Sequence, residues 1–456
     1  MNILSPEYLL FSSVSTFLTW LFRGKTRKYA VLLACLVFLY FLRASLLDVI
    51  YVLALFAYVF LAQKIIEKRE DRMVPLVLMI LPVLGLAYFK YAGYLTGRNL
   101  LLPLGISFYT FKAVSFLAEV HKKNVSVQDA VSLFDYICFF PVFMAGPIHR
   151  PQPFFEELKK PFVFDYRDQK NGFVQTLLGL FEKLVIADFL KSVTASFYSP
   201  SLSGVYTVLA VILYAFYIYA DFDAYSNVAI GIARMMGFHI ERNFHAPYCS
   251  ASVMEFWRRW HISLSSWLRD YVYIPLGGSR RGVLRKYLNI LIVFLASGLW
   301  HGNTVMFLVW GLGHGILNIL ENILSYPLRG KNWVKYLKPL LVLFNFAAVA
   351  LLWVPFQSAS MQEVISVFSR LSLANLASFD PSAAGLVMNE WFLVIACLLM
   401  LVITDVLRYH RDMLEVLSGQ FILLRWVFYA LLIAIVIIFG VYGPGYHPED
   451  FIYVTF

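Results

Sequence analysis

The composition of this 456-residue chain excludes a soluble protein. Residues of the AVILMFWYC set make up 60% of the sequence and charged residues only 14%, with a mean hydropathy of +0.70, whereas soluble domains carry about 25% charged residues. The apolar residues come in long blocks, so lipid must be the solvent for most of the chain. A disordered protein, a coiled coil and a secreted disulfide scaffold are excluded as well. The sequence therefore predicts an all-α polytopic membrane protein.

The net charge of +10, from 38 Lys and Arg against 28 Asp and Glu, is informative about topology. An excess of Lys and Arg marks the cytoplasmic loops of membrane proteins. Basic loops at 23–28, 64–72 and 121–123 alternate with less basic connections, which predicts an extracytoplasmic N-terminus and three cytoplasmic loops. Towards the C-terminus two basic segments, 328–338 and 407–411, do not alternate, so the sequence assigns no topology there.

Hydropathy predicts about eleven membrane crossings. Some apolar segments are shorter than the roughly 20 residues that cross a bilayer, and these could be half-helices or buried elements. The first segment is expected to be a retained span, because no cationic region precedes it as in a signal peptide. The four cysteines are far apart, which predicts packed thiols. The apolar segments are 8–22, 29–42, 46–62, 73–89, 101–118, 173–194, 204–220, 288–300, 304–325, 336–355, 387–406 and 424–441.

Two segments depart from the pattern of spans and short loops. Residues 139–148 are apolar but too short to cross, and their two prolines interrupt helical hydrogen bonding. Irregular backbone at membrane depth is tolerated only inside protein or along a cavity, so we expect a re-entrant or interfacial element. Residues 239–287 are long, aromatic and basic. With no repeat or flexible linker, the chain is expected to form a single membrane domain over 1–456, in which residues 100–325 carry the motifs described next.

An ionisable side chain is predicted at membrane depth, because His301 lies between the apolar segments 288–300 and 304–325. Burial of such a group costs several kcal/mol unless it is paired or hydrated, so it is a functional hypothesis by default. A buried imidazole stays neutral, which is the form that a general base requires. An interhelical hydrogen bond is the alternative interpretation. His314 is expected to be structural, and His261, among arginines and tryptophans, could equally be an interfacial residue.

Six motifs follow one another along the chain: FFPVFMAGPIHR at 139–150, YADFDAYSN at 219–227, WRRWHISLSSWLRD at 257–270, YIPLGG at 273–278, WHG at 300–302 and DFIYVTF at 450–456. Trp-His-Gly alone would be weak evidence, whereas the whole set in this order is specific. The set resembles the membrane-bound O-acyltransferase family and, within it, the bacterial alginate O-acetyltransferase branch.

The resemblance implies an acyltransferase with re-entrant and interfacial helices around a central tunnel or funnel, in which His301 lies deep. His261 matches the family's second histidine position. His301 would act as a general base or as a covalent nucleophile, and the sequence leaves both open. His261 or the indole N–H of Trp300 would donate to the developing oxyanion. In this branch the donor is acetyl-CoA, and the acetyl group ends on an exported polysaccharide or a cell-wall glycan.

Five further residues are candidates for substrate binding. Arg258, Arg259 and Arg269 suit the phosphates of the donor, although such clusters also bind anionic lipid headgroups. Asp221 and Tyr225 belong to an element that helps to line the reaction chamber in the family. The alternative for Asp221 is a structural pair with an arginine. No metal site, no tightly bound cofactor and no nucleic-acid partner is expected.

The sequence contains no Gly-x-Ser-x-Gly or Gly-Asp-Ser element. We therefore expect a separate extracytoplasmic transferase protein that accepts the acetyl group, with membrane lipid as a further partner. The expected location is a bacterial cytoplasmic (inner) membrane, crossed several times. Two other functions remain open at this stage: D-alanyl transfer from a carrier protein to teichoic acid, and a transporter in which His301 and Asp221 relay protons. An acyltransferase that modifies lipid is a further variant.

Overall fold

The structure is helical, as predicted. Apart from one isolated bridge between Gly204 and Leu371, the described chain contains helices, turns and loops. The C-terminal motif at 450–456 lies outside the described residues. The computed structural model describes residues 5–22, 24–42, 45–97, 101–161, 163–325, 331–373 and 379–441.

The chain packs as two compact units. The first unit takes the residues up to Gly179 together with Tyr225–Arg242, and the second takes Leu180–Ala224 and the chain from Asn243 onward. The predicted motif-bearing core at 100–325 contributes to both units. The prediction of a single membrane domain stays a prediction.

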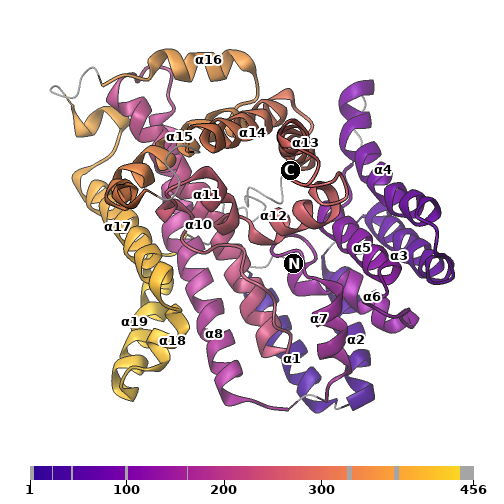
Figure 1. The fold of residues 1–456 in the computed structure, drawn as a ribbon. Helices are drawn as coiled ribbons and strands as arrows, with labels where there is room; N and C mark the ends of the chain where they lie inside the picture. Colours follow the sequence, from indigo (N-terminus) through magenta and orange to yellow (C-terminus); the bar gives the residue numbers. More distant parts are fainter. Residues whose placement is uncertain are drawn as a thin grey trace. The chain divides into compact units, whose positions relative to one another are not determined.

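The first unit packs around two buried helices, α5 and α6. α5 contacts α3, α4 and α7, whereas α6 contacts α2, α3 and α7, and both helices bury nearly all of their side chains. Figure 1 shows α3, α4 and α5 side by side. The helices of this unit are α1 (Pro6–Leu21), η1 (Gly24–Thr26), α2 (Arg27–Phe41), α3 (Leu46–Glu67), α4 (Met73–Thr96), α5 (Ile106–His121), α6 (Ala130–Cys138), η2 (Phe140–Val142), α7 (Pro151–Lys159) and α8 (Tyr166–Phe181).

The second unit is built on a hairpin of α13 and α14, which packs against α15 and α11 (Figure 1). Helix α10 begins in this unit and ends in the first. The helices are η3 (Glu182–Ala187), α9 (Asp188–Phe197), α10 (Val205–Met235), η4 (Pro247–Cys249), α11 (Val253–Arg259), α12 (Ile262–Leu268), η5 (Arg269–Tyr273), α13 (Val283–His301), α14 (Val305–Leu324), η7 (Asn332–Leu337), α15 (Lys338–Gln357), α16 (Met361–Arg370), η8 (Pro381–Ala384), α17 (Met388–His410), α18 (Met413–Ser418) and α19 (Ile422–Phe439).

Eight helices of the described chain are long and apolar enough to cross a membrane, namely α3, α4, α10, α13, α14, α15 with the end of η7, α17 and α19. This confirms a polytopic membrane protein. The other predicted spans, 8–22, 29–42, 101–118 and 173–194, are also helical, but their helices are shorter or interrupted. The count of about eleven crossings therefore stays a prediction.

The proline-containing segment 139–148 forms a buried turn, which confirms the predicted break in the helix. α6 ends at Cys138, the short turn η2 follows, and Phe139 and Phe140 are at most 1% exposed. Gly146 has a φ of +99°, and a Cβ atom there would lie 3.4 Å from the ring of Tyr225. Glycine meets both conditions, since it accepts positive φ without strain. Tyr225, a predicted substrate-binding residue, thus packs against the Ala-Gly-Pro turn within the first unit.

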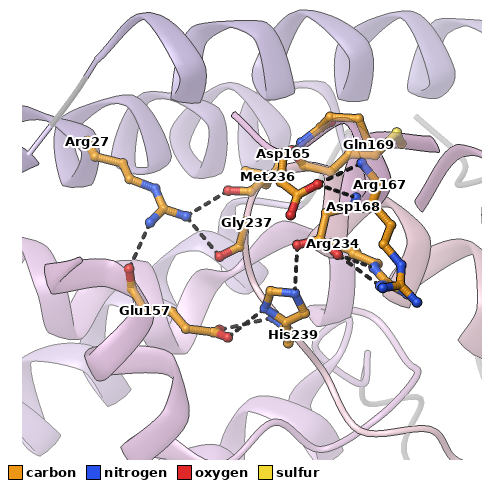
Figure 2. A network of polar contacts seen from close by, with 11 residues as sticks. Arg27, Glu157, Asp165, Arg167, Asp168, Gln169, Arg234, Met236, Gly237 and His239 are labelled. Carbon is orange, nitrogen blue, oxygen red and sulfur yellow. Dashed lines mark hydrogen bonds and ion pairs between the residues drawn. The ribbon is translucent and has the colours of Figure 1, made fainter. Parts of the chain in front are cut away.

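Arg27 joins three segments of the first unit (Figure 2). Its guanidinium donates to the main-chain carbonyl of Glu157 at 2.7 Å, and to those of Met236 and Gly237 at 2.7 and 3.1 Å. The same group lies 4.5 Å from the centre of the Phe238 ring, close enough for a cation–π contact. The start of α2, the end of α7 and the loop after α10 are therefore held together.

His239 adds a second link beside Arg27, because its ring lies between two carboxylates (Figure 2). Its Nδ1 is 2.9 Å from Oε1 of Glu157, and its Nε2 is 3.2 Å from Oδ2 of Asp168. Asp168 is also paired with Arg234 at 2.8 Å. The hydrogen bond that the His239 ring donates to the Glu157 carboxylate, with the negative charges of Glu157 and Asp168, raises the pKa of His239 despite partial desolvation.

We expect His239→Gln to destabilise the protein more at about pH 5.5 than at about pH 8.5. Because the folded-state pKa of His239 lies above the unfolded-state value, its stabilisation is complete at low pH and is lost as the pH rises through the folded-state pKa. The ring is 54% exposed, so solvent screening limits the effect to about 1 kcal/mol or less. Thermal unfolding of the detergent-solubilised protein at both pH values measures it, with exposed His410→Gln as the control. An equal loss at both pH values would contradict this role.

Candidate active site

The hairpin of α13 and α14 places His301 at the end of α13, beside the start of α14 at Val305. The two helices approach closely at glycines. A Cβ on Gly298 would lie 2.4 Å from the carbonyl oxygen of Phe307, and one on Gly302 would lie 2.0 Å from the Phe307 ring. Small residues allow such contacts between membrane helices. The glycine of the Trp-His-Gly motif is thus required by packing.

His301 is 3% exposed and is surrounded by aromatic rings. The ring centres of Trp300 and Trp310 are each 4.9 Å from that of His301, and that of Phe356 is 5.2 Å away, all in edge-to-face geometry. These aromatic rings cover the imidazole, in keeping with its low exposure. The structure therefore places His301 in the surroundings predicted for a buried general base.

His261 contacts the same indole as His301. Its ring centre is 5.9 Å from that of Trp300 and 4.7 Å from that of Phe222, and the residue is fully buried. Full burial does not fit the alternative of an interfacial residue in an aromatic belt. The structure thus brings together His261, Trp300 and His301, the three residues to which the family resemblance assigned the chemistry.

The backbone of His261 adopts the left-handed conformation, with φ +42° and ψ +55°. This conformation costs a residue other than glycine about 1–3 kcal/mol and persists where the surrounding structure enforces it. Asn243 supplies that constraint: its carbonyl accepts from the N–H of Ile262 at 2.9 Å, and its Oδ1 accepts from the hydroxyl of Ser263 at 2.7 Å. Sequence reasoning missed Asn243, because no motif marks it. Its contacts hold the backbone of the two residues that follow His261.

Asp221 lies inside α10 and is held by a buried lysine. Lys183 Nζ is 2.6 Å from Asp221 and 2.7 Å from Asp188, and these side chains are at most 7% exposed. Lys183 belongs to the π-helical turn η3, a distortion that is frequent at functional sites. The alternative expected for Asp221 was a pair with an arginine, and the partner is a lysine instead. A role of Asp221 in substrate binding stays a prediction.

The next carboxylate of the motif, Asp223, pairs with Arg408 of α17, and the hydroxyl of Tyr219 donates to Asp405 of the same helix. Helix α10 continues beyond the apolar segment 204–220 to Met235 and carries both carboxylates inside it. Buried acidic groups are tolerated inside a helix when partners from other helices compensate their charge.

The three candidate arginines have different surroundings. Arg259 pairs with Glu255 at 3.0 Å, and its guanidinium lies 4.3 Å from the centre of the Tyr409 ring. Arg258 is exposed, and the side chain of Arg269 is 63% exposed. Arg259 therefore contributes to the packing of the second unit, whereas Arg258 and Arg269 point towards the surroundings, as a phosphate or headgroup contact requires.

The basic segments near the C-terminus converge at one end of the second unit. Nζ of Lys338, at the start of α15, is 3.0 Å from the hydroxyl of Tyr409, at the end of α17, and Arg259 lies over the same ring. We call these residues the basic end of the second unit. The described part of the first basic segment, 331–338, and the segment 407–411 thus lie at the same end. Helix α15 starts at this end and α17 ends there. This placement accounts for the two basic segments near the C-terminus that do not alternate with less basic ones.

The helical membrane fold and the buried pair His261 and His301 are consistent with the resemblance of the motifs, and the comparison with protein families gives the class of the protein. The chain belongs to the membrane-bound O-acyltransferase family, whose model matches residues 46–361. This range contains both His261 and His301. The resemblance seen in the motifs is therefore confirmed.

Three relatives show where the chain lies within this family. It is 35% identical over 270 residues to the probable alginate O-acetylase AlgI of Pseudomonas fluorescens, covering 58% of this chain and 52% of that protein. It is 33% identical over 329 residues to the peptidoglycan O-acetyltransferase of Helicobacter pylori, covering 62% and 61%. It is 28% identical over 252 residues to the teichoic acid D-alanyltransferase of Bacillus subtilis, covering 52% and 63%. The chain thus matches 52% to 63% of the length of these relatives.

Gly298→Ala is expected to destabilise the protein by about 1–3 kcal/mol, the usual cost of overpacking. The new methyl group would meet a main-chain oxygen at 2.4 Å, which cannot rotate away as a side chain can. The thermal unfolding midpoint in detergent measures the effect. Gly419→Ala is the control, because the nearest atom to its Cβ is 3.4 Å away. Similar midpoints for the two variants would contradict the close contact of α13 with α14.

Lys183→Met is expected to lower the free energy of unfolding by about 3–5 kcal/mol, because two buried carboxylates lose their compensating charge. Adding Asp221→Asn should restore part of the loss, as a double-mutant cycle would show. Lys122→Met is the control: Lys122 pairs with Glu119 at 2.8 Å with its side chain 46% exposed, and such surface pairs contribute at most about 1 kcal/mol. A loss at Lys183 no larger than at Lys122 would show that the buried pairs do not stabilise the unit.

Proposed function

We propose that this protein is a membrane O-acetyltransferase that moves acetyl from cytoplasmic acetyl-CoA across the membrane for O-acetylation of an exported polysaccharide or cell-wall glycan. The observation that carries the proposal is the burial of His301 and His261 against one indole, Trp300. The names of two relatives, an alginate O-acetylase and a peptidoglycan O-acetyltransferase, support acetyl as the group and a glycan as the acceptor.

Transfer of acetyl from a thioester to a hydroxyl requires a general base more than a general acid. A thiolate leaves an acetyl thioester readily, whereas an acceptor hydroxyl has to lose its proton. His301 would take that proton while the hydroxyl oxygen bonds to the acetyl carbon, and the carbon–sulfur bond breaks as CoA leaves and regains a proton. His261 or the N–H of Trp300 would donate to the oxyanion. The covalent route, with acetyl carried first by His301, uses the same residue as nucleophile.

The distribution of basic residues supports transfer from a donor on the cytoplasmic side to an acceptor on the other side. If the basic end of the second unit is cytoplasmic, as the distribution of Lys and Arg favours, the exposed Arg258 would bind the donor phosphates. Arg269 is 63% exposed and would contribute while it stays paired with Asp270 at 2.8 Å. α15 then rises about 30 Å from Lys338 to Gln357, roughly the thickness of the hydrocarbon core. Phe356, which contacts His301, lies in the last turn of α15, at the opposite end from Lys338.

Transfer of acetyl across the membrane requires that substrates reach His301 from both faces of the membrane. The proposal therefore includes an extracytoplasmic N-terminus, about eleven crossings, and re-entrant and interfacial helices around a central tunnel or funnel. It places the protein in a bacterial cytoplasmic (inner) membrane. An extracytoplasmic transferase protein would accept the acetyl group, because the sequence lacks the Gly-x-Ser-x-Gly element of a serine transferase.

His301→Ala should lower the release of CoA from radiolabelled acetyl-CoA by about 10²–10⁴-fold, the contribution typical of a general base. His261→Ala should cost about 10²–10³-fold if it donates to the oxyanion. Purified protein in lipid nanodiscs is the material, and His410→Ala, an exposed histidine of α17, is the matched control. Equal label transfer by the wild type and His301→Ala would remove His301 from the mechanism.

D-alanyl transfer to teichoic acid is the second candidate, supported by the 28% identity to the Bacillus subtilis enzyme. A requirement for an acylated carrier protein in place of free acetyl-CoA would favour it. A transporter, the remaining alternative, would move its substrate without any acyl donor, and His301→Ala would abolish that flux.

A further inference from the structure

Helix α16 presents a stripe of apolar side chains that the second unit leaves uncovered. Met361, Ile365 and Phe368 are 41%, 61% and 43% exposed. Their spacing of four and three residues places them on one side of the helix. Neighbouring apolar side chains that stay exposed mark a contact surface, so this stripe requires a partner.

The other sides of α16 have different surroundings. Val364 and Val367 are buried and pack the helix against the rest of the unit. Gln362, Ser366 and Ser369, by contrast, are polar and exposed. At about 100° per residue, the buried side and the polar side face away from each other, and the apolar stripe lies between them.

We propose that α16 lies along the membrane surface and binds lipid through Met361, Ile365 and Phe368, which we call the lipid stripe. In this arrangement the lipid stripe enters the boundary between headgroups and acyl chains, and the polar side of the helix faces water. An amphipathic helix in this position inserts its apolar face by about 5–10 Å. The proposal rests on the membrane fold and does not depend on the proposed function.

The path of the chain favours lipid as the partner. α15 belongs to the helices that are long and apolar enough to cross the membrane, and it ends at Gln357, shortly before α16 begins. A chain that leaves a spanning helix emerges at a membrane surface. The ten residues of α16 extend only about 15 Å, which is too short to cross the bilayer. A short helix at this position, with one apolar and one polar exposed side, has lipid and water as its neighbours.

Contacts with the loop between α9 and α10 fix the rotation of α16. Nη1 of Arg370 donates to the carbonyls of Ser199 and Leu202 at 2.8 and 3.0 Å, and the carbonyl of Arg370 accepts from the N–H of Gly204 at 2.9 Å. The two buried valines hold the same helix against the unit. The lipid stripe is therefore held in its exposed position and does not turn inward.

The charges of α16 favour contact with neutral as well as anionic lipid. Glu363 and Arg370 have opposite charges, and both are bound to main-chain groups: the carboxylate of Glu363 accepts from the N–H of Ala359 at 2.8 Å, and Arg370 donates to carbonyls. The helix contains no lysine, so it carries no basic cluster of the kind that binds anionic headgroups. Insertion should therefore depend on the lipid stripe.

This assignment also relates the candidate site to the membrane surface. Phe356 lies in the last turn of α15, just before the connection to α16, and its ring centre is 5.2 Å from that of His301. His301 would therefore lie nearer to the surface that carries α16 than to the basic end of the second unit.

Spin labels on two sides of α16 test the proposal. Ile365→Cys and Phe368→Cys place labels in the lipid stripe, and Gln362→Cys and Ser366→Cys are the matched controls on the polar side of the same helix. All four side chains are exposed, so the core stays intact, which the thermal unfolding midpoint of each variant checks. The full chain is reconstituted in nanodiscs of phosphatidylcholine. The unsubstituted chain gives the background, because Cys249 is half-buried whereas the other native cysteines are buried.

Collisions of the labels with oxygen, which partitions into lipid, and with a water-soluble nickel chelate give the depth of each position. We expect the two labels in the lipid stripe to collide mainly with oxygen, at a depth of about 5–10 Å, and the two controls to collide mainly with nickel. Equal collision rates on both sides of the helix, or free access of nickel to the stripe, would overturn the lipid contact. Protection of the stripe from both reagents would assign it to a second copy of the chain or to another protein, and would also overturn it.

The same measurement in nanodiscs that contain phosphatidylglycerol tests the argument from charge. We expect the same depth in both lipids, because the charged groups of α16 are bound to the main chain. Insertion that occurs only with the anionic lipid would show that basic groups, and not the lipid stripe, hold the helix at the surface.

Discussion

The close contact between α13 and α14 is the constraint on which the candidate site depends. At Gly298 the main chain of one helix touches the main chain of the other, and this contact sets the position of His301 three residues later. Aromatic rings then fill the space around the imidazole, and Trp300 extends the contact to His261. The close contact at Gly298 and the large ring of Trp300 thus both contribute to the burial of the His301 imidazole.

Ion pairs and basic side chains connect the other helices of the second unit. Carboxylates within α10 are compensated by Lys183 and Arg408 from other elements, which allows one long helix to carry acidic groups at depth. The basic ends of α11, α15 and α17 meet around Tyr409, while α16 follows the opposite end of α15.

Much of this could be predicted from the sequence, for a physical reason. Hydrophobic length is a local property, so all twelve apolar segments are helical in the structure. The buried histidines could also be found, because ionisable groups stand out in apolar sequence. Contacts with distant partners could not be predicted: Lys183 and Arg408 pair with carboxylates of α10, Asn243 accepts a hydrogen bond from Ser263 beside His261, and the hydroxyl of Tyr409 lies 3.0 Å from Lys338. Each is a pair between residues that no local pattern connects.

The central claim is that one buried imidazole serves a donor from one face of the membrane and an acceptor from the other. Proteoliposomes of known protein orientation test it most directly, with radiolabelled acetyl-CoA on the side of the basic end and a polysaccharide acceptor, together with any partner protein, sealed on the other. The claim predicts label on the acceptor across the membrane, and none with His301→Ala. Label that stays in the compartment of the donor, or that crosses equally well without His301, would contradict it.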